Sequence, residues 1–115
     1  MSDYTPDRWV VVKITTNDET LYKVFACWYG GYAGSDSWQM NSGIVKVEST
    51  DETRFWNYYV FHGYSGSVYR CYKNCYGING YGATVLQNFI DKADYKIEIM
   101  PENTNWKELN YASKL

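Results

Sequence analysis

The first third of the chain carries apolar runs that are typical of β-strands. Residues 8–15 read Arg-Trp-Val-Val-Val-Lys-Ile-Thr, and this run of β-branched side chains predicts a strand. Residues 16–19 are polar and favour a turn, and residues 21–29 predict a second strand. The two strands are therefore expected to pair as a hairpin.

Shorter apolar runs predict further strands over residues 38–40, 43–48, 54–62 and 67–73, separated by polar or glycine-containing turns. In the last of these runs we expect Val68, Arg70 and Tyr72 to face one way, and Ser67, Tyr69 and Cys71 to face the other. The run over 54–62 is apolar at successive positions, so we expect both of its faces to be covered.

The hydrophobic period changes after residue 82. Apolar residues then recur at helical spacing, at Val85, Leu86, Phe89, Ile90 and Ala93. This spacing predicts a helix over about 83–93. Residues 95–100 alternate again and predict a strand that ends at Pro101. Asn105 and Glu108 have the spacing of a capping box, which predicts a short helix over about 106–112.

These elements predict an α+β fold in a single domain spanning residues 1–115. We expect an antiparallel, strongly twisted sheet or a partly open barrel of five to seven strands, with one packed helix and a short C-terminal helix. No stretch approaches the roughly 18 apolar residues of a membrane span, so no membrane partner is expected.

Aromatic residues make up 19% of the chain, and 13 of them are tyrosine. All nine glycines lie between residues 30 and 82, interleaved with many of these rings. Aromatic rings supply flat faces for stacking, and glycines let the backbone approach a ligand closely. The mixture favours a recognition surface, although strands rich in tyrosine also explain part of it.

The formal net charge is −2, and the basic residues are scattered singly. Duplex nucleic acid is therefore not an expected partner, because such binding neutralises many phosphates. A small anion needs only one or two cations and stays open. The three cysteines are an odd number, which favours a reducing cytoplasm over a secreted disulfide scaffold.

Neither a metal nor a cofactor is expected. Cys71 and Cys75 are separated by three residues rather than the two of a typical zinc pair, and His62 is the one imidazole. We interpret the thiols as small apolar groups.

The first candidate site is the glycine loop before the predicted helix. Gly80 and Gly82 would let an anion reach the unpaired N–H groups of the helix start, with Arg70 adding charge. A plain tight turn explains the same glycines.

The second candidate is the segment between two predicted strands. Trp28, Tyr29, Tyr32 and Trp38 could stack on a base, while Ser35 and Asp36 could bond to a ribose or a base amine. Equally, both tryptophans could be core residues, with Ser35 and Asp36 closing a turn.

The third candidate is Ser65-Gly66-Ser67-Val68-Tyr69, whose hydroxyls could contact phosphate. Ser65 lacks the second glycine of a nucleophile elbow, and no spacing ensures contact with His62. Catalysis is therefore disfavoured.

Several of these motifs together resemble a group of small accessory proteins of tailed bacteriophages. The resemblance covers roughly residues 8–82 and rests on residues 9–14, 28–32, 34–38, 42–44, 65–69 and 76–77. It implies a role in the host cytoplasm and brings no assigned activity or residue role.

We therefore expect a non-catalytic homo-oligomer that sequesters a small nucleotide-derived ligand, such as a host immune signal. The predicted site comprises Trp28, Tyr29, Tyr32, Ser35, Asp36, Trp38, Ser65, Ser67, Tyr69, Arg70, Gly80 and Gly82. The alternatives are a module that inhibits a host protein through an aromatic patch and, less favoured, an enzyme acting on nucleotides.

Overall fold

The computed structural model describes residues 3–30, 34–50, 57–109 and 111. The strands are β1 (Asp3–Tyr4), β2 (Arg8–Thr15), β3 (Thr20–Trp28), β4 (Ser37–Met40), β5 (Ile44–Ser49), β6 (Tyr58–Gly63), β7 (Val68–Tyr72) and β8 (Lys96–Ile99). The α-helix is α1 (Gly80–Lys92), and two 3-10 turns are η1 (Lys73–Cys75) and η2 (Trp106–Glu108). The predicted α+β class is confirmed.

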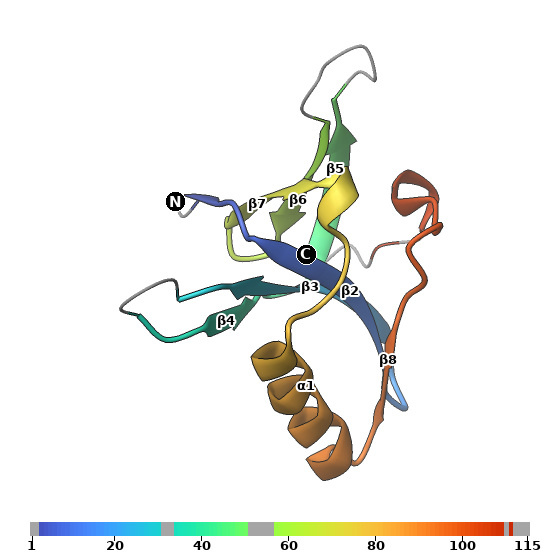
Figure 1. The fold of residues 1–115 in the computed structure, drawn as a ribbon. Coiled ribbons are helices and arrows are strands. Elements are labelled where there is room, and N and C mark those ends of the chain that lie inside the picture. Colours follow the sequence, from blue (N-terminus) through green and yellow to red (C-terminus); the bar gives the residue numbers. More distant parts are fainter. Residues whose placement is uncertain (1–2, 31–33, 51–56, 110, 112–115) are drawn as a thin grey trace.

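The strands form two four-stranded sheets rather than one sheet or a barrel (Figure 1). Sheet A has the order β1-β7-β6-β5, and sheet B has the order β4-β3-β2-β8. β1 pairs with β7 in parallel, whereas the other neighbours are antiparallel. β1 has only two residues, so its sequence carries no periodicity that could have predicted it.

The predicted hairpin of the first two strands is confirmed, with Arg8 opposite Cys27 and Thr15 opposite Thr20. Thr16 closes the turn between them. Its N–H donates to the Glu19 carbonyl oxygen at 2.9 Å, and its hydroxyl oxygen accepts the Asp18 N–H at 3.2 Å. This side-chain bond replaces a backbone partner within the turn.

β2 and β3 are buried on both faces, which explains their continuous apolar runs. One face packs against sheet A in a core of Trp9, Val11, Val24, Ala26, Ile44, Phe61, Tyr69, Cys71 and Trp106. The opposite face packs against α1 in a core of Val10, Val12, Ile14, Phe25, Cys27 and Leu86. Sheet A, sheet B and the helix are therefore three successive layers.

The predicted helix is confirmed but begins earlier, at Gly80. Asn79 is its N-cap, and its Oδ1 accepts the Gly82 N–H at 2.6 Å. Two glycines in the first turn lower the intrinsic helix propensity there, so the sequence pattern placed the start too late. The cap and the burial of Gly82 compensate.

The predicted helix over 106–112 is not found in the described part of that segment. Trp106 instead begins a 3-10 turn, and the Asn105 side chain makes no capping bond. Trp106 is 2% exposed and lies with its ring centroid 6.0 Å from that of Trp9. Insertion of this indole into the core fixes the chain direction, so the capping-box prediction is wrong. Residues 110 and 112–115 lie outside the described residues.

Sheet A is covered on one face only by a layer of described elements. Phe61 is buried in the core, whereas Tyr58, Val60 and His62 on the other face of β6 are half-buried. The expectation that both faces are covered is therefore wrong for the described part of this strand, and residues 54–56 lie outside it. No helix in the described ranges is long and apolar enough to cross a membrane.

Candidate functional site

The first group of predicted site residues lies at the end of the β3–β4 hairpin. The Trp28 Nε1–H donates to the Thr5 carbonyl oxygen at 3.1 Å, and the ring packs edge-on to Tyr4 with centroids 6.2 Å apart. Tyr29 is 53% exposed, and its backbone N–H donates to Asp7 Oδ2 at 2.8 Å. This places an exposed tyrosine on a rigid support.

The loop that follows is closed by Asp36, whose Oδ1 accepts the Gly30 N–H at 2.9 Å. One carboxylate oxygen of Asp36 is thus bonded within the loop, which agrees with the alternative interpretation that Asp36 closes a turn. Ser35 is exposed beside it. Tyr32 lies outside the described residues.

Two predicted site residues are built into the packing. The Trp38 ring stacks on the Phe25 ring, with centroids 5.5 Å apart and an angle of 12° between the ring planes. Phe89 of α1 packs against Trp38 in a T-shaped arrangement, with centroids 5.3 Å apart and an angle of 76° between the planes. Tyr69 is 1% exposed, and its hydroxyl oxygen accepts a hydrogen bond from Gln39 Nε2 at 3.0 Å. Both rings stabilise the layers.

Arg70 alternates with Tyr69 along β7 and therefore lies on the outer face of sheet A. Its guanidinium forms an ion pair with Asp3, and that pair raises the pKa of Arg70 further. Trp28 packs against the core between the two sheets. Arg70 thus lies on the outer face of sheet A, whereas Trp28 of β3 packs against the inner face of that sheet. The two side chains therefore do not share one ligand surface.

Of the two glycines at the helix start, Gly82 serves close packing. A Cβ atom on Gly82 would overlap Cys27 Sγ, and the Gly82 N–H is already bonded to the Asn79 side chain. Gly80 is exposed, with nothing near its Cβ position. The tight approach of the helix to β3 therefore explains Gly82 without an anion.

Ser65 and Ser67 are brought together in the β6–β7 turn. Their hydroxyl oxygens are 3.4 Å apart. The Ser42 hydroxyl donates to Ser65 Oγ at 3.1 Å, and Ser42 Oγ accepts the Ser65 backbone N–H at 2.8 Å. Ser42 also lines a small hollow of about 140 Å³ beside Tyr64, which is 57% exposed. This turn is a compact hydroxyl cluster.

The predicted residues thus occupy separate parts of the fold. Trp28 and Tyr69 both contact Tyr4, and Ser65 meets Ser67. Gly80 and Gly82 lie at the helix start, and Arg70 lies on the outer face of sheet A. The contacts of the described residues do not assemble the combined aromatic and phosphate site that the sequence predicts.

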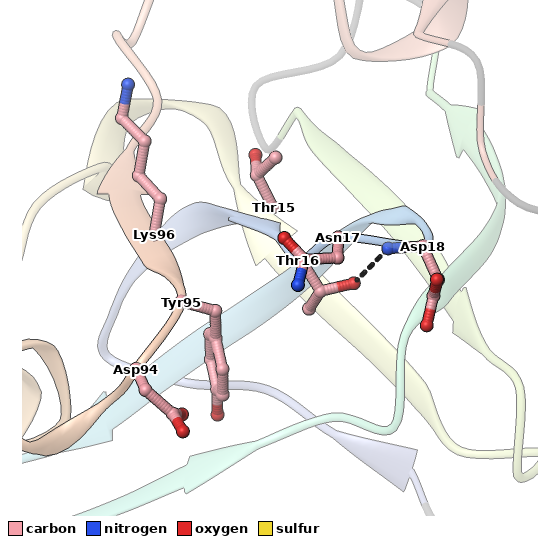
Figure 2. A pocket seen from close by; sticks show the side chains of 7 residues that line it. All are labelled: Thr15, Thr16, Asn17, Asp18, Asp94, Tyr95 and Lys96. Atoms are coloured by element: carbon pink, nitrogen blue, oxygen red, sulfur yellow. Dashed lines mark hydrogen bonds between the residues drawn. The ribbon is translucent and has the colours of Figure 1, made fainter.

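A larger hollow, of about 470 Å³, lies between the β2–β3 turn and the link from α1 to β8 (Figure 2). It is lined by Thr15, Thr16, Asn17, Asp18, Asp94, Tyr95 and Lys96. Pairing of Thr15 with Lys96 at the ends of β2 and β8 brings the two segments together. We name it the turn hollow.

Figure 2 shows how the side chains of the turn hollow are arranged. The Asp94 carboxylate and the Tyr95 ring point the same way, while Lys96 points away from them. Tyr95 is 46% exposed. The Thr16 hydroxyl is held in the turn by the Asp18 N–H, so the threonine acts as a fixed support.

The charge of the turn hollow is predominantly negative. Asp18 and Asp94 contribute two carboxylates, and the ammonium of Lys96 is 3.7 Å from Glu98 Oε2. Carboxylates accept hydrogen bonds and repel phosphates. The hollow is therefore suited to a ligand with hydroxyl or amine donors and a flat face for Tyr95.

The turn hollow was not predicted from the sequence. Its two halves are polar turns separated by more than seventy positions, and only the β2–β8 pairing brings them together. The one local signal was an aromatic residue directly after an aspartate, at Asp94 and Tyr95. That signal does not reveal a partner segment.

The described residues contain no assembled catalytic or metal centre. His62 Nε2 lies 3.1 Å from Glu48 Oε1, and this contact lowers the pKa of Glu48. Burial raises the pKa of the Cys27 and Cys71 thiols, which disfavours reactive thiolates. Within the described ranges, no three His, Cys, Asp or Glu side chains are grouped to hold a metal ion.

Comparison of the chain with family models, with curated proteins and with solved structures found no match. Function is therefore inferred from the chemistry of the site alone.

Proposed function

We propose that this chain is a non-catalytic binding protein that sequesters a small nucleotide-derived ligand, recognised through its base and ribose. The ligand lies in the turn hollow. Asp18 and Asp94 accept hydrogen bonds from ribose hydroxyls or base amines, and Tyr95 stacks on the base. The capture of a host immune signal is part of this proposal; the resemblance to phage accessory proteins is compatible with such a ligand but assigns no activity.

The observation that carries the proposal is that the turn hollow combines the volume of a small-molecule site with hydrogen-bond acceptors and an aromatic ring in its lining. Small-molecule sites typically measure about 300–1,000 Å³, and the turn hollow measures about 470 Å³. The exposed ring of Tyr95 and the acceptor Asp94 come from one of its two walling segments, and the acceptor Asp18 comes from the other. A nucleoside presents the complementary groups, a flat base and several hydroxyl donors.

The affinity we expect is moderate. A single base–aromatic stack contributes about 1–3 kcal/mol, and the hollow offers one ring, Tyr95. The predicted phosphate clamp does not contribute, because Arg70 does not line the turn hollow and is paired with Asp3 on the outer face of sheet A. We therefore expect dissociation constants of roughly micromolar rather than nanomolar order.

The test is calorimetric titration with adenosine, adenosine monophosphate and a cyclic dinucleotide. We expect adenosine to bind at least as tightly as the phosphorylated ligands, because the carboxylates repel phosphate. Tyr95→Ala is expected to weaken binding about tenfold or more through the lost stack. Tyr64→Ala is the matched control, since Tyr64 is also an exposed tyrosine but lies at another hollow.

Tighter binding of the phosphorylated ligands, or unchanged affinity in Tyr95→Ala, would contradict the proposal. Failure of all three ligands to bind at millimolar concentration would contradict the ligand class.

A second candidate function, inhibition of a host protein, is favoured by the outer face of sheet A. Tyr58 and Tyr72 pack edge to face there with ring centroids 5.7 Å apart, and next to them Arg70 lies opposite Val60, followed by Val68. Tyrosine and arginine are frequent in protein-interaction hot spots. A stoichiometric protein recovered with the purified chain would favour this function, whereas a small molecule released by heating would favour the first.

A further inference from the structure

β8 is an outer strand of sheet B. The sheet order ends at β8, whose one strand partner among the described elements is β2. Figure 1 shows β8 along the right-hand border of the sheet. An outer strand carries a row of backbone N–H and C=O groups that can pair with another chain.

The register identifies which backbone groups of β8 face outward. The Met100 N–H donates to the Val11 carbonyl oxygen at 2.8 Å, so these two residues are a hydrogen-bonded pair. Such pairs alternate along an antiparallel ladder. The backbones of Lys96 and Glu98 are therefore directed toward β2, and those of Ile97 and Ile99 toward the open edge, while Tyr95 lies in the bend before the strand.

The side chains along this edge are largely exposed. Tyr95, in the bend before β8, is 46% exposed, and Ile99, at the end of β8, is 47% exposed. Lys96 and Glu98 form an ion pair of 3.7 Å on the opposite face of the strand. The segment 95–99 thus alternates apolar and charged residues of opposite sign.

We propose that β8 pairs antiparallel with β8 of a second copy of this chain, about a twofold axis at Ile97. Tyr95 of one copy then lies opposite Ile99 of the other, and Ile97 lies opposite its own equivalent. Lys96 lies opposite Glu98 of the second copy. Each apolar pair and each charge pair is complementary across the axis.

Neighbouring registers are unfavourable. An axis at position 96 places lysine opposite lysine, and an axis at position 98 places glutamate opposite glutamate. The backbone does not distinguish these registers, because each of them places outward-directed residues opposite one another, so the side-chain charges decide between them. With the axis at Ile97, the two sheets B become one continuous eight-stranded sheet.

An opposing interpretation is that Lys96 and Glu98 protect the edge against pairing, as charged side chains often do. The two interpretations differ in what a charge reversal does. If the charges protect the edge, reversal leaves the chain monomeric. If they specify the pairing, reversal removes a dimer that the wild-type chain forms.

The experiment is sedimentation of the ligand-free chain over a range of concentrations, as wild type, Lys96→Glu and Glu98→Lys. Each variant places like charges across the axis, so we expect dimer dissociation constants raised about tenfold or more. An equimolar mixture of the two variants restores opposite charges at both positions, and we expect it to form heterodimers. Lys107→Glu and Glu102→Lys are controls with the same charge changes at exposed positions away from β8.

Amide hydrogen exchange identifies the interface directly. In the dimer the N–H groups of Ile97 and Ile99 are expected to be protected, and in Lys96→Glu they are expected to exchange rapidly. A wild-type chain that stays monomeric at all concentrations would overturn the inference. So would a dimer whose affinity both variants leave unchanged, or one in which these two amides stay unprotected. Because no ligand is present, none of these outcomes depends on the proposed function.

Discussion

Gly82 of α1 lies against the thiol of Cys27 on β3, so closely that a Cβ atom at position 82 would overlap Sγ. Cys27 is fully buried, and burial raises its pKa. The contact fixes how near the first turn of the helix approaches sheet B. A glycine in a helix is usually destabilising, and here close packing accounts for it.

We expect Gly82→Ala to lower the free energy of unfolding by about 1–3 kcal/mol, because the added methyl group overpacks the helix–sheet contact. Chemical denaturation monitored by circular dichroism measures this change. Gly80→Ala is the matched control, since its Cβ position is open, and we expect that variant to be neutral or more stable.

A double variant tests whether Cys27 is the obstacle. Cys27→Ala removes the sulfur atom that the new methyl group would meet, so Gly82→Ala should cost less stability in that background. Equal costs in the two backgrounds would show that the strain arises elsewhere.

Asn79 is expected to hold the start of α1. Loss of the 2.6 Å bond from the Gly82 N–H in Asn79→Ala should lower the free energy of unfolding by about 1 kcal/mol. Asn79→Ser retains a capping oxygen and should lose less. Thermal unfolding of the three proteins distinguishes these results, and equal melting temperatures would contradict the assigned cap.

Ionisation of the Tyr76 phenol is expected to make the free energy of unfolding fall at alkaline pH. Burial raises its pKa to about 12, and its hydroxyl donates to the Met100 carbonyl oxygen at 2.5 Å. The unfolded chain ionises this group near its ordinary value of about 10. The stabilisation is therefore complete below about pH 10 and is lost as the pH rises from there toward about 12.

We expect this alkaline loss of stability to be smaller in Tyr76→Phe, which has no ionisable phenol at that position. The variant should also be less stable at neutral pH by about 1–3 kcal/mol, because the Met100 carbonyl and the Val11 N–H lose a partner. Denaturation at several pH values measures both effects. Tyr81→Phe, at an exposed tyrosine, is the control.

The local pattern predicted the elements of this fold well where burial produces a continuous apolar run or a clear helical period. The runs that became β2 and β3 are buried on both faces, and Leu86 and its neighbours mark the helix face. The pattern failed where a single tertiary contact decides the structure. Trp106 enters the core and leaves a 3-10 turn where Asn105 and Glu108 predicted a helix.

The site was harder to predict than the fold because side-chain direction and long-range pairing decide it. Nothing local shows that Arg70 is paired with Asp3, or that Trp38 stacks on Phe25. Pairing of β2 with β8 creates the turn hollow, and a strand partner cannot be read from either segment alone.

Asp94 is expected to contribute an acceptor without stabilising the fold. Asp94→Asn keeps the shape of the side chain but converts one acceptor oxygen into a donor group, so adenosine affinity should fall about tenfold. The melting temperature should stay unchanged because Asp94 is exposed. Unaltered affinity would remove Asp94 from the proposed site.

The most direct test of the account is an NMR titration of the isotope-labelled chain with adenosine. We predict saturable shifts in the amides of residues 15–18 and 94–96, the two segments that wall the turn hollow. Shifts confined to residues 28–36, or no saturable shift at millimolar adenosine, would contradict it.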